Sequence, residues 1–253
     1  MNLRQSAAWW CFSPLLEPLT LVKAAAEIGY AGLDFVPEIH WPLVRDHGLI
    51  VSCMQGHRSL EHGLNDPLNH DRIARELEDS IRLAERSGIP NLVCFSGSRY
   101  GPSDTEGALV TAAGFNRVAK IAEDAGVTLV LELLNSRVDH PKYQADHTAW
   151  GSEVCRLVDS SRVKLLYDIY HMQIMEGDLI RTITAHHASI GHYHTAGNPG
   201  RNEISDPEQE IAYPAITRAI QSTGFQGFVC HEFVPRGNPI KALESAFSIG
   251  QGV

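Results

Sequence analysis

A unit of one amphipathic helix and one short apolar segment recurs along the chain. The helical part ends at a glycine and the apolar part follows, as in AAAEIG-YAGLDFV, LAERSG-IPNLVCF and AEDAG-VTLVLE. Short apolar runs rich in β-branched residues are typical of parallel strands buried on both faces. Glycine suits the left-handed conformation in which many helices end. The glycines at these predicted helix ends are Gly29, Gly48, Gly88, Gly126 and Gly224.

Eight apolar segments, separated by helical patterns, qualify as strands. They lie near residues 3–9, 31–36, 49–54, 91–96, 128–133, 163–168, 189–194 and 227–233. Alternating strands and helices imply parallel pairing with right-handed crossovers. Eight such units fit a closed barrel, which takes about 250 residues. We therefore predict a single (β/α)8 TIM-barrel domain over residues 1–253. The alternative is an open doubly wound sheet, but no G-x-G-x-x-G follows the first strand.

The composition argues against several classes of partner. With 21 Lys and Arg against 30 Asp and Glu, the formal net charge is −9, so no basic field attracts phosphates. We therefore expect no nucleic-acid partner. No apolar run approaches the roughly 20 residues of a membrane span, and the N-terminal segment lacks the pattern of a signal peptide. Five widely spaced cysteines without a C-x-x-C motif favour reduced thiols, and we expect a cytoplasmic protein.

Four consecutive predicted strands, the fifth to the eighth, end in side chains that bind metal ions. These are Glu132, Asp168, His194 and Glu232. The C-terminal ends of the strands carry the chemistry in TIM barrels. Three carboxylates gathered there would repel one another unless a cation balanced them. An oxygen-rich set with one imidazole favours one divalent ion, Mn²⁺ or Mg²⁺, with Co²⁺ an option and Zn²⁺ less favoured. Each residue alone could be a helix cap or core group, so the common register carries the prediction.

Further candidates lie in loops that follow the predicted strands. His171, three positions after Asp168, could bind a substrate oxygen. Arg201 and Glu203 lie in the loop GNPGRNE, where an arginine could hold a carboxylate or hydroxyl group. His57, after the third strand, is a weaker candidate for substrate binding. For each of them, the alternative is a structural or surface side chain.

Two further features leave their roles open. Trp9, Trp10 and Phe12 could either pack against the barrel or form a wall of the substrate site. The long loop after Glu132 could form a lid; it contains Asp139, His140, Lys142 and His147.

Four strings resemble the hydroxypyruvate isomerase family of the xylose isomerase-like barrels. They are LELLNSRVDHP, LLYDIYHMQIMEGD, GHYHTAGNPGRNEI and HEFVPRG, and the likeness is most specific between residues 128 and 237. The resemblance implies one divalent metal on the four strand-end residues and homo-oligomers. It also implies that Glu132 and Glu232 act as acid and base on opposite sides of the substrate. His171 and Arg201 fall where relatives hold substrate oxygens.

The sequence departs from the pattern of that family at one predicted ligand. Bacterial hydroxypyruvate isomerases carry glutamine where His194 stands, whereas the related ketose 3-epimerases carry histidine. Those epimerases in turn have a glutamate where this chain has Val138. The departure leaves the substrate open.

The resulting hypothesis is a metal-dependent isomerase of a small hydroxy-carbonyl compound, a keto acid or a sugar. Hydroxypyruvate to tartronate semialdehyde is the reaction that the resemblance implies, with proton transfer by glutamates through a metal-stabilised enediolate. A hydride shift would replace that step if the hydrogen did not exchange with solvent. The main alternative is a ketose 3-epimerase or other sugar isomerase with the same metal and glutamates. A metal-dependent hydrolase of abasic DNA and a binding protein without turnover are further alternatives.

Overall fold

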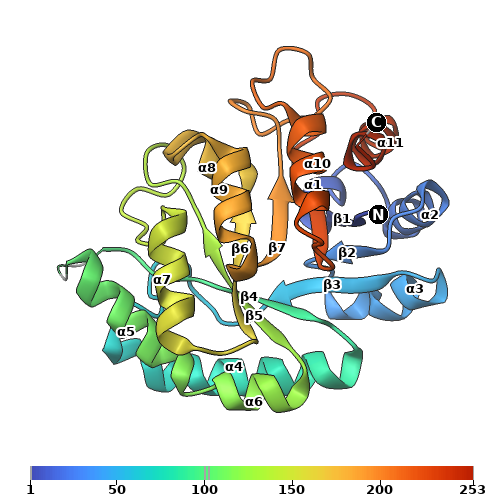
Figure 1. The fold of residues 1–253 in the computed structure, drawn as a ribbon. Helices are drawn as coiled ribbons and strands as arrows, with labels where there is room; N and C mark the ends of the chain where they lie inside the picture. Colours follow the sequence, from blue (N-terminus) through green and yellow to red (C-terminus); the bar gives the residue numbers. More distant parts are fainter. Residues whose placement is uncertain (1, 100, 102, 253) are drawn as a thin grey trace. The chain divides into compact units, whose positions relative to one another are not determined.

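Eight strands form a closed barrel in which neighbours in sequence are neighbours in space (Figure 1). The computed structural model describes residues 2–99, 101 and 103–252. Its strands are β1 (Arg4–Ala8), β2 (Gly32–Asp34), β3 (Ile50–Gln55), β4 (Asn91–Cys94), β5 (Thr128–Leu133), β6 (Val163–Asp168), β7 (Ile190–Thr195) and β8 (Phe228–His231). Pairing is parallel where β1 meets β2 and β8, and where β5 meets β4 and β6. The predicted (β/α)8 architecture is confirmed.

Helices separate the strands, as the sequence pattern predicts. They are α1 (Trp9–Phe12), α2 (Pro18–Ile28), α3 (Trp41–Asp46), α4 (His70–Ser87), α5 (Asp104–Asn116), α6 (Ala119–Ala125), α7 (Thr148–Val158), α8 (Ile169–Met175), α9 (Leu179–His186), α10 (Tyr213–Ser222) and α11 (Pro239–Gly250). Short 3₁₀ turns are η1 (Glu38–His40), η2 (Pro67–Asn69) and η3 (His187–Ser189). All five glycines at the predicted helix ends have positive φ. At the end of α4, for example, Gly88 adopts φ +69° and its N–H donates to the Ala84 and Glu85 carbonyls.

Four strands, β1, β2, β4 and β8, end earlier than predicted, and the ends of β1 and β2 bear on the site. β1 stops at Ala8, and α1 begins at Trp9. Trp10 therefore lies on a short helix with its side chain partly exposed. β2 stops at Asp34 because Phe35 adopts a left-handed φ of +59°, which is incompatible with an extended strand. Asp34 is thus the last residue of its strand.

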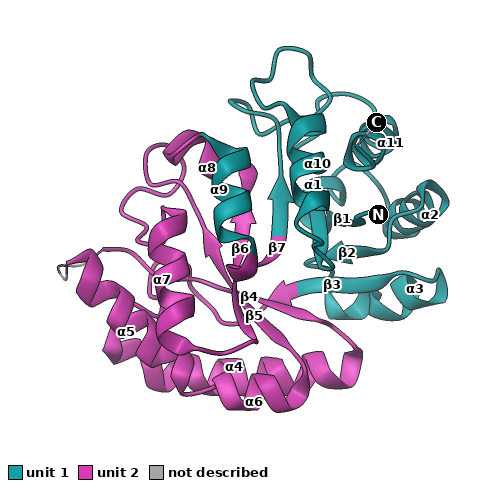
Figure 2. Ribbon diagram, in the orientation of Figure 1, with its two compact units in different colours: residues 1–53, 178–187, 193–253 teal, residues 54–177, 188–192 magenta. Residues whose placement is uncertain are grey.

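Tertiary contacts divide the chain into two compact units (Figure 2). Unit 1 comprises Met1–Cys53, Asp178–His187 and Tyr193–Val253, and unit 2 comprises Met54–Gly177 and Ala188–His192. In unit 1, the rings of Phe12 and Phe233 pack edge to face at 5.4 Å. In unit 2, Tyr143 and Tyr167 are fully buried. A single domain over the whole chain stays a prediction.

Two predictions from the sequence concern membrane-spanning segments and the state of the cysteines. No helix among residues 2–99, 101 and 103–252 is long and apolar enough to cross a membrane. The five cysteines are all buried.

Candidate metal centre and active site

The Glu232 carboxylate, in unit 1, is buried and surrounded by nitrogen atoms. It follows β8 directly, and its side chain is 6% exposed. Trp10 Nε1 donates to Oε1 at 2.9 Å, and Arg201 Nη2 donates to Oε2 at 2.6 Å. His194 Nδ1 lies 3.0 Å from the same Oε2. A carboxylate with these neighbours is held in one orientation and in its charged form.

The electrostatic balance at Glu232 favours ionisation. Burial by itself raises the pKa of this carboxyl. The cationic groups that face it and the indole N–H outweigh burial and hold its pKa well below the usual range. These contacts therefore favour the ionised form of Glu232 at neutral pH.

Arg201 reaches Glu232 from the loop between β7 and α10. Its backbone is left-handed at φ +52°, and its carbonyl accepts from the N–H of Val234 beyond β8. The guanidinium lies over the Trp10 ring, 5.7 Å from its centroid, and the side chain is 22% exposed. The cation is thus fixed between an aromatic face and a carboxylate, at a place that solvent reaches.

His194, at the end of β7, has a carboxylate beside each ring nitrogen. Glu232 faces Nδ1, and Asp34 Oδ2 lies 3.4 Å from Nε2. Asp34 is completely buried and accepts a hydrogen bond from the Ser52 hydroxyl. An imidazole that binds a metal through one nitrogen commonly donates to a carboxylate through the other. Asp34 suits this supporting role.

In unit 2, Glu132 and Asp168 occupy the C-terminal ends of β5 and β6. Both are buried, and Glu132 pairs in register with Leu166 of β6. The Tyr143 hydroxyl donates to the Glu132 carbonyl at 2.9 Å, which holds this strand end. Asp168 also caps α8, because Oδ1 accepts from the backbone N–H of His171 at 3.1 Å. The two predicted ligands thus end neighbouring, paired strands.

The His171 imidazole lies beside Asp168 and is fully buried. Its Nε2 is 3.6 Å from Asp168 Oδ2. Its Nδ1 is 2.6 Å from the side-chain nitrogen of Asn135, which follows β5. The His140 ring, from the long loop after β5, is 5.3 Å from the His171 ring. His171 thus lies on α8 beside Asp168 and not in a loop as predicted, and its role in substrate binding stays a prediction.

Comparison with known proteins places the fold. A family model described as xylose isomerase-like TIM barrel matches residues 22–248. The chain belongs to the xylose isomerase-like TIM-barrel family.

Relatives with named activities cover much of the chain. A protein of Escherichia coli K12 named hydroxypyruvate isomerase is 25% identical over 235 residues, covering 86% of this chain and 88% of its own. A 2-oxo-tetronate isomerase of Cupriavidus necator is 33% identical over 146 residues, covering 56% of this chain and 55% of its own. A Brucella melitensis structure described as an AP endonuclease of family 2 is 25% identical with a TM-score of 0.82, covering 96% and 97%.

Both units of this xylose isomerase-like barrel contain buried side chains of the kind that hold a divalent ion. Glu132 and Asp168 are buried in unit 2, and His194 and Glu232 in unit 1. Carboxylate oxygens with one imidazole suit Mg²⁺ or Mn²⁺. Carboxylates are costly to bury without compensating positive charge, so the donors of each unit, taken separately, suit a divalent ion.

Two of the predicted substrate-binding residues of the barrel make backbone contacts instead. His57 Nε2 accepts from the Phe95 N–H at 2.9 Å, which leaves Nδ1 to donate to the Arg58 carbonyl at 3.1 Å. Glu203 Oε1 accepts from the backbone N–H of Arg236 at 2.7 Å. These contacts connect loops to one another. They do not support a substrate role for His57 or Glu203, which stays a prediction.

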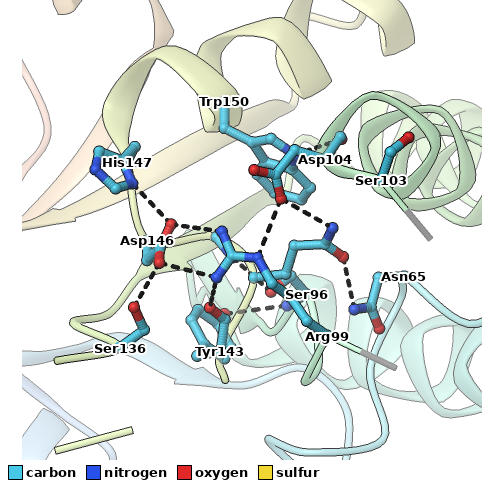
Figure 3. A network of polar contacts seen from close by, with 12 residues as sticks. Asn65, Ser96, Arg99, Ser103, Asp104, Ser136, Tyr143, Asp146, His147 and Trp150 are labelled. Atoms are coloured by element: carbon cyan, nitrogen blue, oxygen red, sulfur yellow. Dashed lines mark hydrogen bonds and ion pairs between the residues drawn. The ribbon is translucent and has the colours of Figure 1, made fainter. Parts of the chain in front are cut away.

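The loop after β5, which the sequence suggests as a lid, is held near its C-terminal end by contacts to Asp146 (Figure 3). Arg99 donates to both carboxylate oxygens of Asp146, at 2.9 and 3.0 Å, and to the Tyr143 carbonyl at 2.7 Å. The Ser136 hydroxyl and His147 contact the same carboxylate at 2.6 and 2.8 Å. The ion pair between the partly exposed Arg99 and the buried Asp146 thereby links the loops after β4 and β5.

Sequence reasoning did not single out Asp34 or Asn135. Asp34 obeys the rule that found the other acids, since it ends a buried strand, but its predicted strand ran on to residue 36. Asn135 has no comparable signal in the sequence, because the conformation of the loop after β5 determines which groups it contacts.

Proposed function

We propose that this chain is a divalent-metal-dependent isomerase of small hydroxy-carbonyl compounds, with hydroxypyruvate and tartronate semialdehyde as its substrate pair. The observation that carries the proposal is the buried Glu232 carboxylate, kept ionised beside Arg201 and Trp10 at a strand end. An enzyme that shifts a proton between adjacent carbons needs such a pre-set acceptor. The named relatives that are isomerases support the same class.

We further propose that one ion is bound by Glu132, Asp168, His194 and Glu232. The strands that carry or precede these residues, β5 to β8, are consecutive in the closed barrel, which supports the assignment. Asp34 would orient the His194 imidazole through Nε2, leaving Nδ1 as the ligand nitrogen on the side of Glu232. Mg²⁺ and Mn²⁺ are the ions to test first, followed by Co²⁺ and Zn²⁺.

The chain's own residues divide the chemistry between them. When bound, the divalent ion supplies Lewis acidity toward the carbonyl and hydroxyl oxygens of the substrate. Glu232, which is held as a carboxylate, would remove the proton from the carbon that bears the hydroxyl group. Glu132, in its protonated form, would return a proton to the adjacent carbon of the enediolate, while the hydroxyl proton passes to the former carbonyl oxygen. Arg201 and the indole of Trp10 hold Glu232 as a carboxylate in a fixed orientation, so little reorganisation is needed at the moment of transfer.

The substrate's carboxylate would meet Arg201, whose side chain is the partly exposed cation of this site. His171 would contact a substrate oxygen from the side of Asp168. A second candidate substrate is 2-oxo-tetronate, which is favoured by the 33% identity to a 2-oxo-tetronate isomerase over 146 residues. Both candidates are small oxo acids, and the same residues serve either one.

A substrate panel tests the proposal. Metal-stripped protein is re-supplied with one ion at a time and assayed with hydroxypyruvate, 2-oxo-tetronate and free ketoses. We expect activity on an oxo acid that depends on the added ion, with uptake of solvent deuterium at the reacting carbon. Retention of the original hydrogen would replace proton transfer by a hydride shift. A preference for ketoses would favour the epimerase alternative.

Variants at the two glutamates provide the decisive control. Glu132→Gln and Glu232→Gln should each lower kcat by about 10²–10⁴-fold, the usual contribution of an acid or base. Glu153→Gln on the exposed surface of α7 should leave kcat unchanged. Activity that persists in both site variants would show that the reaction occurs elsewhere. Cleavage of abasic DNA by the wild type, lost in the same variants, would instead support a hydrolase.

A further inference from the structure

The orientation of the Asn135 side-chain amide is determined by three hydrogen bonds to two neighbouring residues. Its oxygen accepts from the backbone N–H groups of Val138 and Asp139, both at 2.9 Å. Its nitrogen donates to Asp139 Oδ2 at 2.6 Å. Rotating the amide by half a turn would place its NH₂ group against two N–H donors and its oxygen against a carboxylate. Only one orientation of Asn135 satisfies these contacts, and the amide is fully buried, so water cannot substitute for them.

This orientation assigns the proton on the neighbouring imidazole. The Asn135 side-chain nitrogen lies 2.6 Å from Nδ1 of His171. The nitrogen has two hydrogens, of which one points to Asp139 and the other to the imidazole. Because an NH₂ group can only donate, Nδ1 must accept and cannot carry a hydrogen. A neutral His171 therefore carries its proton on Nε2.

From these contacts we infer that Asn135 is a positioning residue that holds His171 as an Nε2–H donor. The protonated nitrogen lies 3.6 Å from Oδ2 of Asp168, one of the proposed ion ligands. A substrate oxygen beside the ion would receive a hydrogen bond from His171 rather than face a lone pair. This role rests on the proposed function, whereas the tautomer itself follows from the local contacts. Asp139 serves the same arrangement indirectly, since it accepts the second amide hydrogen.

Nitrogen NMR tests the inference without any activity measurement. The Mg²⁺-supplemented protein is labelled with ¹⁵N-histidine and studied in mildly alkaline buffer, where an ordinary imidazole is neutral. The His171 signals are assigned by their loss in His171→Gln. In the wild type we expect the shift of an unprotonated nitrogen at Nδ1 and of a protonated one at Nε2. A protonated Nδ1 would overturn the inference.

Two variants test whether Asn135 sets the tautomer. In Asn135→Asp, the carboxylate can still accept from both backbone N–H groups but can only accept from the imidazole, so the proton should move to Nδ1. In the matched control Asp139→Asn, the Asn135 amide remains and the proton should stay on Nε2. An unchanged tautomer in Asn135→Asp, or an equal change in both variants, would overturn the role of Asn135.

Kinetics then connect the tautomer to turnover. Asn135→Asp should lower kcat/KM by about tenfold or more, the effect of losing one hydrogen bond to a substrate oxygen. Asp139→Asn should remain within about threefold of the wild type, as expected when that hydrogen bond is kept. If the tautomer moves while kcat/KM does not, His171 is not a donor to the substrate and the inference fails at that step. If the wild type shows no isomerase activity but the expected tautomer, the proposed function fails while the local assignment stands.

Discussion

Replacing Arg99 with methionine would remove the cation of the network that links the loops after β4 and β5 (Figure 3). The guanidinium donates four hydrogen bonds: two to Asp146, one to the Tyr143 carbonyl and one to Asp104. Methionine replaces the apolar stem but lacks the guanidinium group, so the substitution removes mainly the charged contacts.

The size of the expected effect follows from the burial of the two partners. The Asp146 side chain is 4% exposed, whereas Arg99 is 31% exposed. Breaking a fully buried ion pair by removing one partner costs roughly 3–5 kcal/mol. Solvent screens the exposed part of Arg99, and Ser136 still donates to the orphaned carboxylate. We therefore expect Arg99→Met to lower the free energy of unfolding by about 2–3 kcal/mol.

Arg156 offers a matched control. It also binds a carboxylate with two hydrogen bonds, at 2.7 and 2.6 Å to Glu153, but the two side chains are 68% and 46% exposed. Arg156→Met should cost no more than about 0.5 kcal/mol, because exposed pairs within one helix contribute little. Urea unfolding of both variants measures the difference. Equal losses in the two variants would refute the argument that burial decides the contribution of the pair.

The same network predicts a dependence on pH. Burial raises the pKa of Asp146, but hydrogen bonds from Arg99 and two neighbours outweigh it, so the pKa lies below its ordinary value of 3.8. The folded protein then binds this proton less tightly than the unfolded chain does. The stabilisation is present above pH 3.8 and is lost as the pH falls through the folded pKa. The difference between wild type and Arg99→Met should therefore be constant near neutrality and shrink in acid.

Three other substitutions test separate parts of the molecule. Asp34→Asn removes the charge behind the proposed imidazole ligand and should weaken Mg²⁺ binding by about 10–100-fold, measured by calorimetry. Unchanged affinity would rule out a supporting role for this carboxylate. Trp10→Phe keeps an aromatic face but loses the donor to Glu232. It should reduce kcat/KM by about tenfold or more in a steady-state assay, and wild-type values would exclude this contact from catalysis. Gly63→Ala places a methyl group into the backbone of residues 95–97 and should lower the thermal midpoint by several degrees. A midpoint equal to that of the wild type would contradict the close approach.

The sequence alone was sufficient for the architecture. Burial on both faces of parallel strands leaves continuous apolar runs, and helix ends leave glycines, so both features can be read locally. Local patterning also placed Glu132 and Asp168 at strand ends and His194 and Glu232 at or just beyond theirs. These predictions succeeded because each depends on neighbours within a few positions of the chain.

Strand ends set by unusual backbone geometry could not be predicted in this way. Asp34 ends β2 because Phe35 turns into a left-handed conformation, which a large side chain rarely adopts. The apolar run GLDFV shows no sign of that turn. The position of the Asp34 carboxylate beside His194 was therefore visible only in the folded chain.

Hydrogen-bond partners were likewise decided by tertiary structure. Trp10 donates to a carboxylate 222 positions away, and the two ring nitrogens of His57 are taken up by backbone groups. A histidine or tryptophan has the same donors and acceptors whether it serves structure or catalysis. Sequence periodicity determined which elements form and approximately where they lie. Which polar atoms form hydrogen bonds was decided only by the tertiary structure. A hydrogen bond requires donor and acceptor to be placed to within a few tenths of an ångström, and no local sequence pattern encodes that placement.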